Sequence, residues 1–226
     1  ILKLNRLIPD IAMPLSGFIG ALLVILLVYF INTRRGIFMI QGLLLTGVMI
    51  SFISSSLVIL ILAISRTEDL HGIIFWIMGS LEEPNWVLIW VATTASLACL
   101  AFSYLFCLDM NALSLGEEEA IHLGVDVEKK KKLLFLIASI LTGISVSVTG
   151  LIGFVGLIVP HFMRMFVGFD HRILLLSSFL AGAGFLIFCD MLARIVIAPI
   201  ELPVGVITGI IGGSIFIYAL NKRSSF

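Results

Sequence analysis

Long stretches without a charged residue dominate the chain, and they set the elements that we expect. Four of them cover residues 11–33, 36–65, 84–108 and 133–159. A helix needs about 20 apolar residues to cross the hydrocarbon core of a bilayer, and each stretch is long enough. The pattern therefore predicts membrane-spanning helices rather than the strands of a barrel.

The composition agrees with that pattern. The chain has 226 residues, of which 60% are hydrophobic and 12% are charged, and its mean hydropathy is +1.20. A soluble domain of this length carries a much larger share of charged residues, so we expect an integral membrane protein. The first residue is Ile1 rather than methionine, so we expect an N-terminal part to be missing and the helix count to be a lower bound.

The basic residues gather in short clusters that orient the helices. Three of these clusters are Arg34–Arg35, Lys129–Lys132 and Lys222–Arg223. Cytoplasmic loops of membrane proteins are enriched in lysine and arginine, so we expect all three clusters on the cytoplasmic side. Two crossings, near residues 37–64 and 86–107, fit between the first two clusters.

A largely acidic stretch lies between those two crossings, and we expect it outside. It also contains the apolar segment GIIFWIMGSL (residues 72–81). This segment is too short to cross a bilayer, so it predicts a helix that lies at the outer surface.

The segment GFVGLIVPHFMRMFVGFDHR (residues 153–172) interrupts the apolar pattern with glycines, a proline and titratable groups. A single helix over residues 133–167 would give an odd number of crossings between the lysine cluster and the basic tail. A turn in the region of residues 150–156 restores an even number, and a short helix then returns to the cytoplasmic side. Short broken helices are tolerated at membrane depth where protein or a cavity shields them, so we expect this one inside the bundle. The residues that mark the predicted broken helix are Gly153, Gly156, Pro160 and His161.

The remaining pattern predicts a helix over residues 173–197, a turn over 198–203 and a last helix over 204–220. The visible chain then makes seven crossings. We expect an all-α fold, a polytopic helical bundle that forms one domain over residues 1–226, with a cytoplasmic loop over 109–132 inside it.

Signatures of catalysis are nearly absent from the sequence. It has no G-x-x-x-x-G-K-[ST] phosphate loop, no H-E-x-x-H and no G-x-S-x-G, and its four histidines fit no metal spacing. We therefore expect no catalytic residue, no metal site and no cofactor. His161 has two interpretations: it handles protons, or it hydrogen-bonds the carbonyls that Pro160 frees, and the second is favoured.

The longest polar stretch, residues 109–132, has the pattern of two short amphipathic helices with glycines as stops. Acidic residues at the start of the second helix suit the helix dipole. The stretch is either a solvated loop, as most charge runs are, or a docking element for a soluble partner. The residues singled out on it are Leu113, Leu115, Gly116, Glu117, Ala120, Leu123, Gly124 and Val125.

Asp190 and Arg194 lie four positions apart on one predicted helix face, close enough for an ion pair. Arg194 is about 32 Å from the start of that helix, which places it at the outer rim of the membrane. Arg194 pairs either within its own helix or with an acid on a partner, and the spacing favours neither.

Several motifs, in one order, resemble a family of transport proteins. They are WIMGSL (76–81), LSLGEEEAIHLGV (113–125), GFVGLIVPHFMR (153–164) followed by DHR, and ELPVGVITGIIG (201–212). Together they resemble the permease subunits of ABC importers for iron-siderophores, haem and cobalamin, the FecCD-type or BtuC-like family. Members of that family have ten membrane helices, so the resemblance implies that this chain holds the fourth to the tenth.

The resemblance also implies roles for individual residues. The loop from Asn111 to Val125 matches the coupling helices that dock on the cytoplasmic ATPase. Arg194 matches an arginine that binds a glutamate of the substrate-binding protein. The helix that begins near Met39, Ile40 and Gln41 matches an element that lines the translocation path and its gate.

The function that we expect is therefore a permease subunit that moves a metal chelate inward, with ATP hydrolysis on separate subunits. Its expected partners are a second permease copy or a paralogue, an ATPase dimer, a periplasmic or lipoprotein substrate-binding protein and the chelate, and no nucleic acid. The expected location is the cytoplasmic membrane of a bacterium or archaeon, with the C-terminus in the cytoplasm. The alternatives are a stand-alone proton-coupled transporter or intramembrane enzyme that uses His161 and Asp190, or a fragment without activity.

Overall fold

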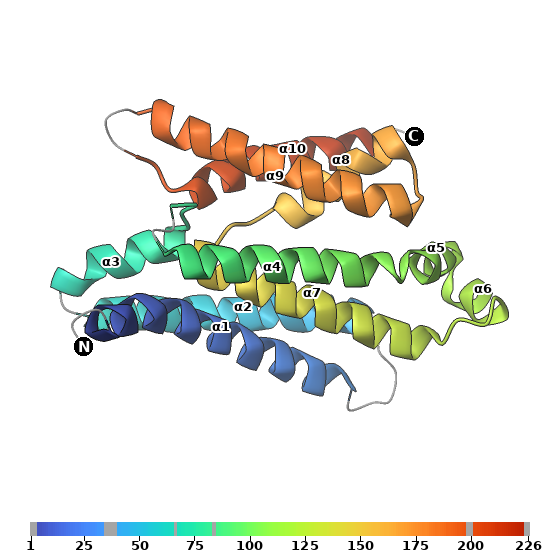
Figure 1. Ribbon diagram of the computed structural model, residues 1–226, viewed down its shortest axis with the longest axis horizontal. Helices are drawn as coiled ribbons and strands as arrows, with labels where there is room; N and C mark the ends of the chain where they lie inside the picture. The colour runs from blue at the N-terminus through green and yellow to red at the C-terminus, as the bar shows by residue number, and fades with distance from the viewer. Residues whose placement is uncertain (1–3, 34–39, 66, 83–84, 198–200, 224–226) are drawn as a thin grey trace.

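The structure is a computed structural model, and it describes residues 4–33, 40–65, 67–82, 85–197 and 201–223. Within these residues the chain forms ten helices and no strand, which confirms the all-α prediction (Figure 1). The helices are α1 (Leu4–Thr33), α2 (Ile40–Ile64), α3 (Thr67–Met78), α4 (Trp86–Tyr104), α5 (Cys107–Leu115), α6 (Glu117–His122), α7 (Val127–Thr149), α8 (Val155–Val167), α9 (His171–Ile195) and α10 (Val204–Arg223).

Short polar side chains start three of the helices. The side chains of Asn85, Asp126 and Asp170 accept hydrogen bonds from backbone N–H groups in the first turns of α4, α7 and α9. These caps satisfy donors that have no partner inside a helix. Glycines with positive φ follow the last residues of α3, α7 and α8, because a left-handed residue ends a helix at little steric cost.

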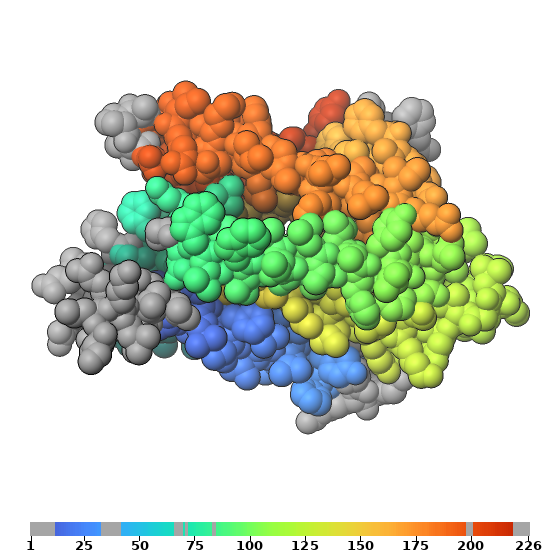
Figure 2. Space-filling view, viewed as in Figure 1, coloured from blue at the N-terminus to red at the C-terminus, as the bar shows by residue number. Residues whose placement is uncertain are grey.

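The helices form two groups that lie side by side (Figure 1). Helix α7 packs against α1 and α4, and α1 packs against α2, whereas α9 packs against α8 and α10. Contacts of α9 with α4 and α5 join the two groups, and the space-filling view shows α4 and α9 against each other on one face (Figure 2).

Helices α5 and α6 project at one end of the bundle, here named the loop end, and α3 lies at the other, here named the α3 end (Figure 1). Helix α9 runs from the loop end to the α3 end, and α10 runs back to the loop end. Thus α7, α9 and α10 place Lys129–Lys132, Arg172 and the end of α10 on the same side of the bundle, as the charge pattern predicts.

The seven expected crossings fall into two classes in the structure. Five helices, α1, α2, α4, α7 and α9, are long and apolar enough to span a membrane. The other two, α8 and α10, contain shorter apolar segments. Helix α8 has 13 residues and is about 20 Å long. It is short because residues 150–154, which precede it, are not helical.

Two predicted boundaries are wrong by about one turn or more. Helix α7 begins at Val127 rather than near residue 133, because its lysines are paired with acids and can extend the helix into the polar loop. Helix α3 begins at Thr67 rather than at residue 72, and it ends at Met78 before Gly79.

Buried side chains concentrate at the two ends of the bundle. One buried cluster joins α5, α6 and α7 at the loop end, and the other joins α9 and α10 at the α3 end. Large apolar side chains along α2 and α4 stay exposed. Because lipid chains are as apolar as these side chains, their exposure inside a membrane carries no hydrophobic penalty.

Candidate functional site

The loop that joins α4 to α7 is compact and has its own core. Ala112, Ala120 and Val127, from α5, α6 and α7, form a buried cluster, and Leu113 and Val125 pack against it. Ala120 is completely buried. Three of the residues predicted on this loop, Leu113, Ala120 and Val125, therefore hold the two short helices together.

The other predicted apolar residues of the loop point outward. Leu115 is 68% exposed and Leu123 is 64% exposed, and Ile121, which is not among the predicted residues, is 60% exposed. Gly116 and Gly124 have φ values of 127° and 84°, so they make the sharp turns that present this apolar tip. The loop thus combines a rigid interior with an exposed apolar tip, which is what a docking element needs.

The lysine run ties α7 to the loop. Lys130 Nζ lies 2.6 Å from Asp109 Oδ2 and 4.5 Å from the centre of the Phe106 ring. Lys131 Nζ lies 2.5 Å from Glu117 Oε1 of α6. These contacts connect the first turns of α7 to both loop helices and neutralise the lysines locally.

A hydrogen-bonded junction connects α5 to the start of α9. The Oδ1 atom of Asn111 accepts from the backbone N–H of His171 at 2.8 Å and faces Nδ1 of the same histidine at 2.7 Å. Its Nδ2 atom donates to Asp170 Oδ1 at 2.9 Å, and the Cys107 thiol lies 3.6 Å from the carbonyl oxygen of His171. The sequence did not predict this junction, although the motif DHR (170–172) marked the α9 side of it.

Asp170 and Cys107, which lie outside the candidate membrane spans, have shifted pKa values. The hydrogen bonds from the Asn111 side chain and then from the backbone N–H of Arg172 hold the pKa of Asp170 below its usual range. Burial and then the charge of Asp170 raise the pKa of the Cys107 thiol. Near neutral pH the junction therefore contains a carboxylate that accepts hydrogen bonds and a thiol that keeps its proton.

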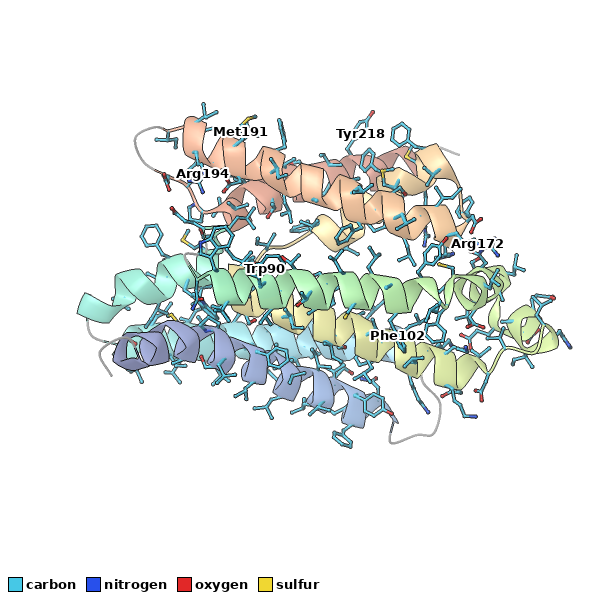
Figure 3. All side chains as sticks on the ribbon, viewed as in Figure 1. Trp90, Phe102, Arg172, Met191, Arg194 and Tyr218 are labelled. Carbon is cyan, nitrogen blue, oxygen red and sulfur yellow. The ribbon has the colours of Figure 1, made fainter. Side chains whose placement is uncertain are left out.

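At the α3 end, Arg194 is held by acids of its own chain. Its Nε atom lies 3.0 Å from Asp190 Oδ2, and its Nη1 atom lies 3.8 Å from Glu201 Oε1. The side chain is still 41% exposed, and Figure 3 shows it at the rim of the bundle. The predicted local pair with Asp190 is present, and the guanidinium also remains accessible from outside.

Three glycines let α3, α7 and α10 meet closely at the same end. A Cβ atom on Gly205 would overlap the backbone carbonyl oxygens of Met78 and Leu151. A Cβ atom on Gly150 would overlap the carbonyl oxygen of Trp76, and Gly150 also has a φ of 70°. The backbone N–H of Ser80 donates to the carbonyl oxygen of Thr149 at 2.9 Å. A third glycine, Gly79, packs against Leu151 in the same place.

The predicted broken helix is present, and its break lies just before α8. Gly153 is in the non-helical segment, and Gly156 and Pro160 are inside α8. Phe154 has a φ of 66°, unusual for a residue other than glycine, and it packs against Gly212 of α10. Within the described residues the ring of His161 contacts Phe162 edge-on, and the predicted hydrogen bonds from His161 to freed carbonyls are not found there.

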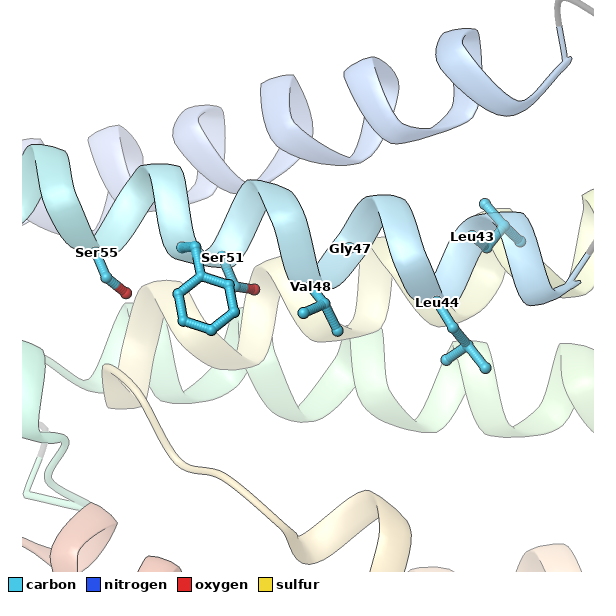
Figure 4. Close-up of a pocket in the computed structure, with 7 residues that line it drawn as sticks. Leu43, Leu44, Gly47, Val48, Ser51 and Ser55 are labelled. Atoms are coloured by element: carbon cyan, nitrogen blue, oxygen red, sulfur yellow. The ribbon is translucent and has the colours of Figure 1, made fainter.

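The predicted gate lies at the start of α2. Met39 is outside the described residues, and Ile40 and Gln41 begin the helix at the loop end. Further along, one face of α2 lines an open groove of about 540 Å³, with Gly47, Ser51 and Ser55 along it (Figure 4). None of the α2 residues in its membrane span is buried, so much of this helix has no neighbour within the described chain.

A metal centre is not found in the part of the chain that the structure describes. No three His, Cys, Asp or Glu side chains lie close enough there to hold a metal ion. The polar sites of the described residues are thus the loop with its α5–α9 junction and the Arg194 rim.

Comparison with protein families gives a match that covers nearly the whole chain. The model of the FecCD transport family matches residues 2–222. A solved structure, of an inward-facing conformation assigned to the metal-chelate type of ABC transporter, is 31% identical in sequence with a TM-score of 0.80. The match covers 93% of this chain and 73% of that one.

Several curated relatives have a similar sequence identity to this chain, but their names refer to different cargoes. The hemin transport system permease protein HmuU of Yersinia pestis is 38% identical over 92% of this chain and 62% of its own length. The cobalamin import system permease protein BtuC of Halobacterium salinarum is 39% identical over 92% of this chain and 56% of its own. The Fe(3+) dicitrate transport system permease protein FecD of Escherichia coli is 38% identical over 95% and 66%, respectively. The chain therefore spans about three fifths of the length of these relatives.

Proposed function

The chain belongs to the FecCD transport family, and on that premise we propose that it forms the permease of an ABC importer that moves a metal chelate inward. It is a multi-pass membrane protein, not an enzyme. The observation that carries the proposal is the match over residues 2–222 together with relatives named for haemin, cobalamin and ferric dicitrate. These three cargoes share one chemistry, a metal held by an organic chelator.

The loop end faces the cytoplasm in this proposal, in the cytoplasmic membrane of a bacterium or archaeon. The basic residues that α7 and α9 place at that end support the orientation. The exposed tip of Leu115, Ile121 and Leu123 then inserts into a groove of the ATPase dimer. Hydrolysis belongs to that partner, because residues 1–226 contain no phosphate loop.

A second copy of the chain, or a paralogue, covers α2. The support is the apolar face of α2, which the described chain leaves exposed along the whole membrane span. Two such faces would enclose a path lined mainly by apolar groups and a few serine hydroxyls, such as Ser51 and Ser55. A weakly interacting wall suits a carrier, because cargo that binds tightly is released slowly.

Transport then follows from exchange between two packings of the bundle. Closure of the ATPase dimer moves the loop, which is joined rigidly to α7 through its lysines and to α9 through Asn111. Each packing persists only if nucleotide or the loaded binding protein binds it more tightly than the other. The proton-coupled alternative has less support, because Asp190 is already paired with Arg194.

Uptake by the assembled transporter in proteoliposomes tests the proposal. With the ATPase and binding protein present, we expect ATP-dependent uptake of one of three labelled chelates: haemin, cobalamin or ferric citrate. A proton gradient without ATP should drive none of them. Uptake that follows the gradient, needs no nucleotide and is lost in His161→Ala would refute the importer and support the alternative.

Arg194 docks the substrate-binding protein through a carboxylate of that partner in this proposal. We expect Arg194→Glu to weaken binding of the binding protein by about 10- to 100-fold, because a charge-assisted hydrogen bond is replaced by repulsion. Surface plasmon resonance on the transporter in nanodiscs measures the change. Arg172→Glu, at the opposite end of the same helix, is the matched control and should leave this affinity unchanged. Equal affinities for Arg194→Glu and the unmodified protein would remove Arg194 from the docking surface.

A further inference from the structure

We infer that Asn111 is the joint through which the loop and α9 move together, and that α9 links the ATPase side of the transporter to the binding-protein side. The inference rests on the proposed function, and it adds a positioning residue and a route. Asn111 touches neither nucleotide nor cargo. It acts by fixing the start of α9 to the loop.

The hydrogen bonds of Asn111 fix the orientation of its side-chain amide. Its carbonyl oxygen faces the backbone N–H of His171, which donates, and the Nδ1 atom of the same residue, which donates in the Nδ1-protonated tautomer. Its amide nitrogen faces an acceptor, Asp170 Oδ1. All three interactions are between 2.7 and 2.9 Å long. Turning the amide over would place a donor against the backbone N–H, so only one orientation satisfies every partner.

Asn111 also meets α9 where that helix most needs a partner. The first N–H groups of a helix have no acceptor inside the helix. Asp170 caps the N–H of Arg172 at 3.0 Å, and Asn111 takes the N–H of His171. A neighbouring helix thus completes the cap of α9, so a displaced loop must carry α9 along or leave these groups without their partners.

The loop side of this joint is rigid enough to transmit a movement. Asn111 precedes Ala112, which is part of the buried cluster with Ala120 and Val127. Lys130 and Lys131 bind α5 and α6 to α7 from the other side. A push on the exposed tip therefore moves one packed unit, in which Asn111 is the polar contact with α9.

The far end of α9 lies at the Arg194 rim. From His171 to Arg194 the helix runs unbroken for about 35 Å, slightly more than the roughly 30 Å thickness of a bilayer core. Arg194 and Arg172 mark its two ends in Figure 3. A helix is stiff over this length, so a shift at the Asn111 joint reaches the surface proposed to dock the binding protein.

The test measures how far the loaded binding protein stimulates ATP hydrolysis by the complete transporter in proteoliposomes. We expect Asn111→Ala to reduce the stimulation ratio at least fivefold, while the affinity of the binding protein stays within twofold. Thr94→Ala on α4 is the control, because within the described residues the hydroxyl of Thr94 bonds to backbone carbonyls of its own helix, outside the loop. Its ratio should equal that of the unmodified transporter.

Substitutions that remove the polar atoms or reverse their charge test the hydrogen bonds of Asn111 separately from its volume. Asn111→Asp alone sets two carboxylates against each other and should lose stimulation, whereas Asp170→Asn alone should have a smaller effect. Asn111→Leu keeps a side chain of similar size without its polar atoms and should lose stimulation as Asn111→Ala does. If Asn111 merely fills space, the leucine variant should keep full stimulation.

Two results would overturn the inference: full stimulation in Asn111→Ala, or full stimulation in Asn111→Leu. Size-exclusion chromatography of each variant shows that the complex is assembled before its ratio is measured. If the unmodified transporter shows no ATP-dependent uptake, the proposed function fails instead, so the two failures are distinguished by the unmodified protein.

Discussion

Gly205→Ala is expected to prevent stable packing of α10 at the α3 end. The added Cβ atom would overlap the carbonyl oxygens of Met78 and Leu151, which are backbone atoms and cannot swing away as a side chain can. Both α3 and the segment after α7 would have to shift. Overpacked sites usually cost about 1–3 kcal/mol, and a double overlap with backbone places the cost at or above the upper figure. Thermal unfolding in detergent should show the loss.

Gly209→Ala provides the matched control for this prediction. Gly209 lies one turn further along α10, and a Cβ atom there would meet no atom within 4 Å. Alanine favours helix over glycine by about 1 kcal/mol, so this variant should be as stable as the unmodified protein or slightly more so. Equal melting temperatures for Gly205→Ala and Gly209→Ala would show that the three-helix junction is not packed as described.

Leu123→Lys should leave the bundle folded and nearly abolish uptake. Leu123 is 64% exposed, so a lysine there meets little resistance from the chain itself. On docking to the ATPase the same position becomes buried, and a charged group then replaces an apolar contact. Burial of a leucine contributes about 1.5–3 kcal/mol, so at least a tenfold loss of ATP-dependent uptake is expected.

The conservative change at the same position is the control. Leu123→Met keeps an apolar side chain of similar volume and should retain most of the uptake. The melting temperature of Leu123→Lys should match that of the unmodified transporter, which separates lost coupling from lost folding. Normal uptake by Leu123→Lys would show that the exposed tip of the loop is not the surface that meets the ATPase.

Much of the fold was predictable because it depends on local pattern. The charge-free runs located the long helices, and the parity of the charge clusters located the break before α8. Gly116 separated the two loop helices where the sequence indicated. The start of α7 was misplaced because hydropathy ends the helix at the lysines, whereas Asp109 and Glu117 pair with them.

The candidate sites were only half predictable. The loop and Arg194 could be singled out by polarity and position alone. Leu113 points inward and Leu115 points outward because of the way α5 packs against α6 and α7. Asn111 carried no local signal, because its partners lie about 60 positions later in the chain.

The sequence by itself determined that this protein crosses a membrane, which ends of its helices share a side and where one helix is broken. These properties depend on hydropathy, charge and glycine or proline content, which act within a few turns of one segment. Only the tertiary structure decided that Asn111 caps α9, that Glu201 shares Arg194 with Asp190 and that Gly205 meets two carbonyl groups. The reason is physical: hydrogen bonds and steric overlap act over a few ångströms between atoms that the chain brings together only when it folds.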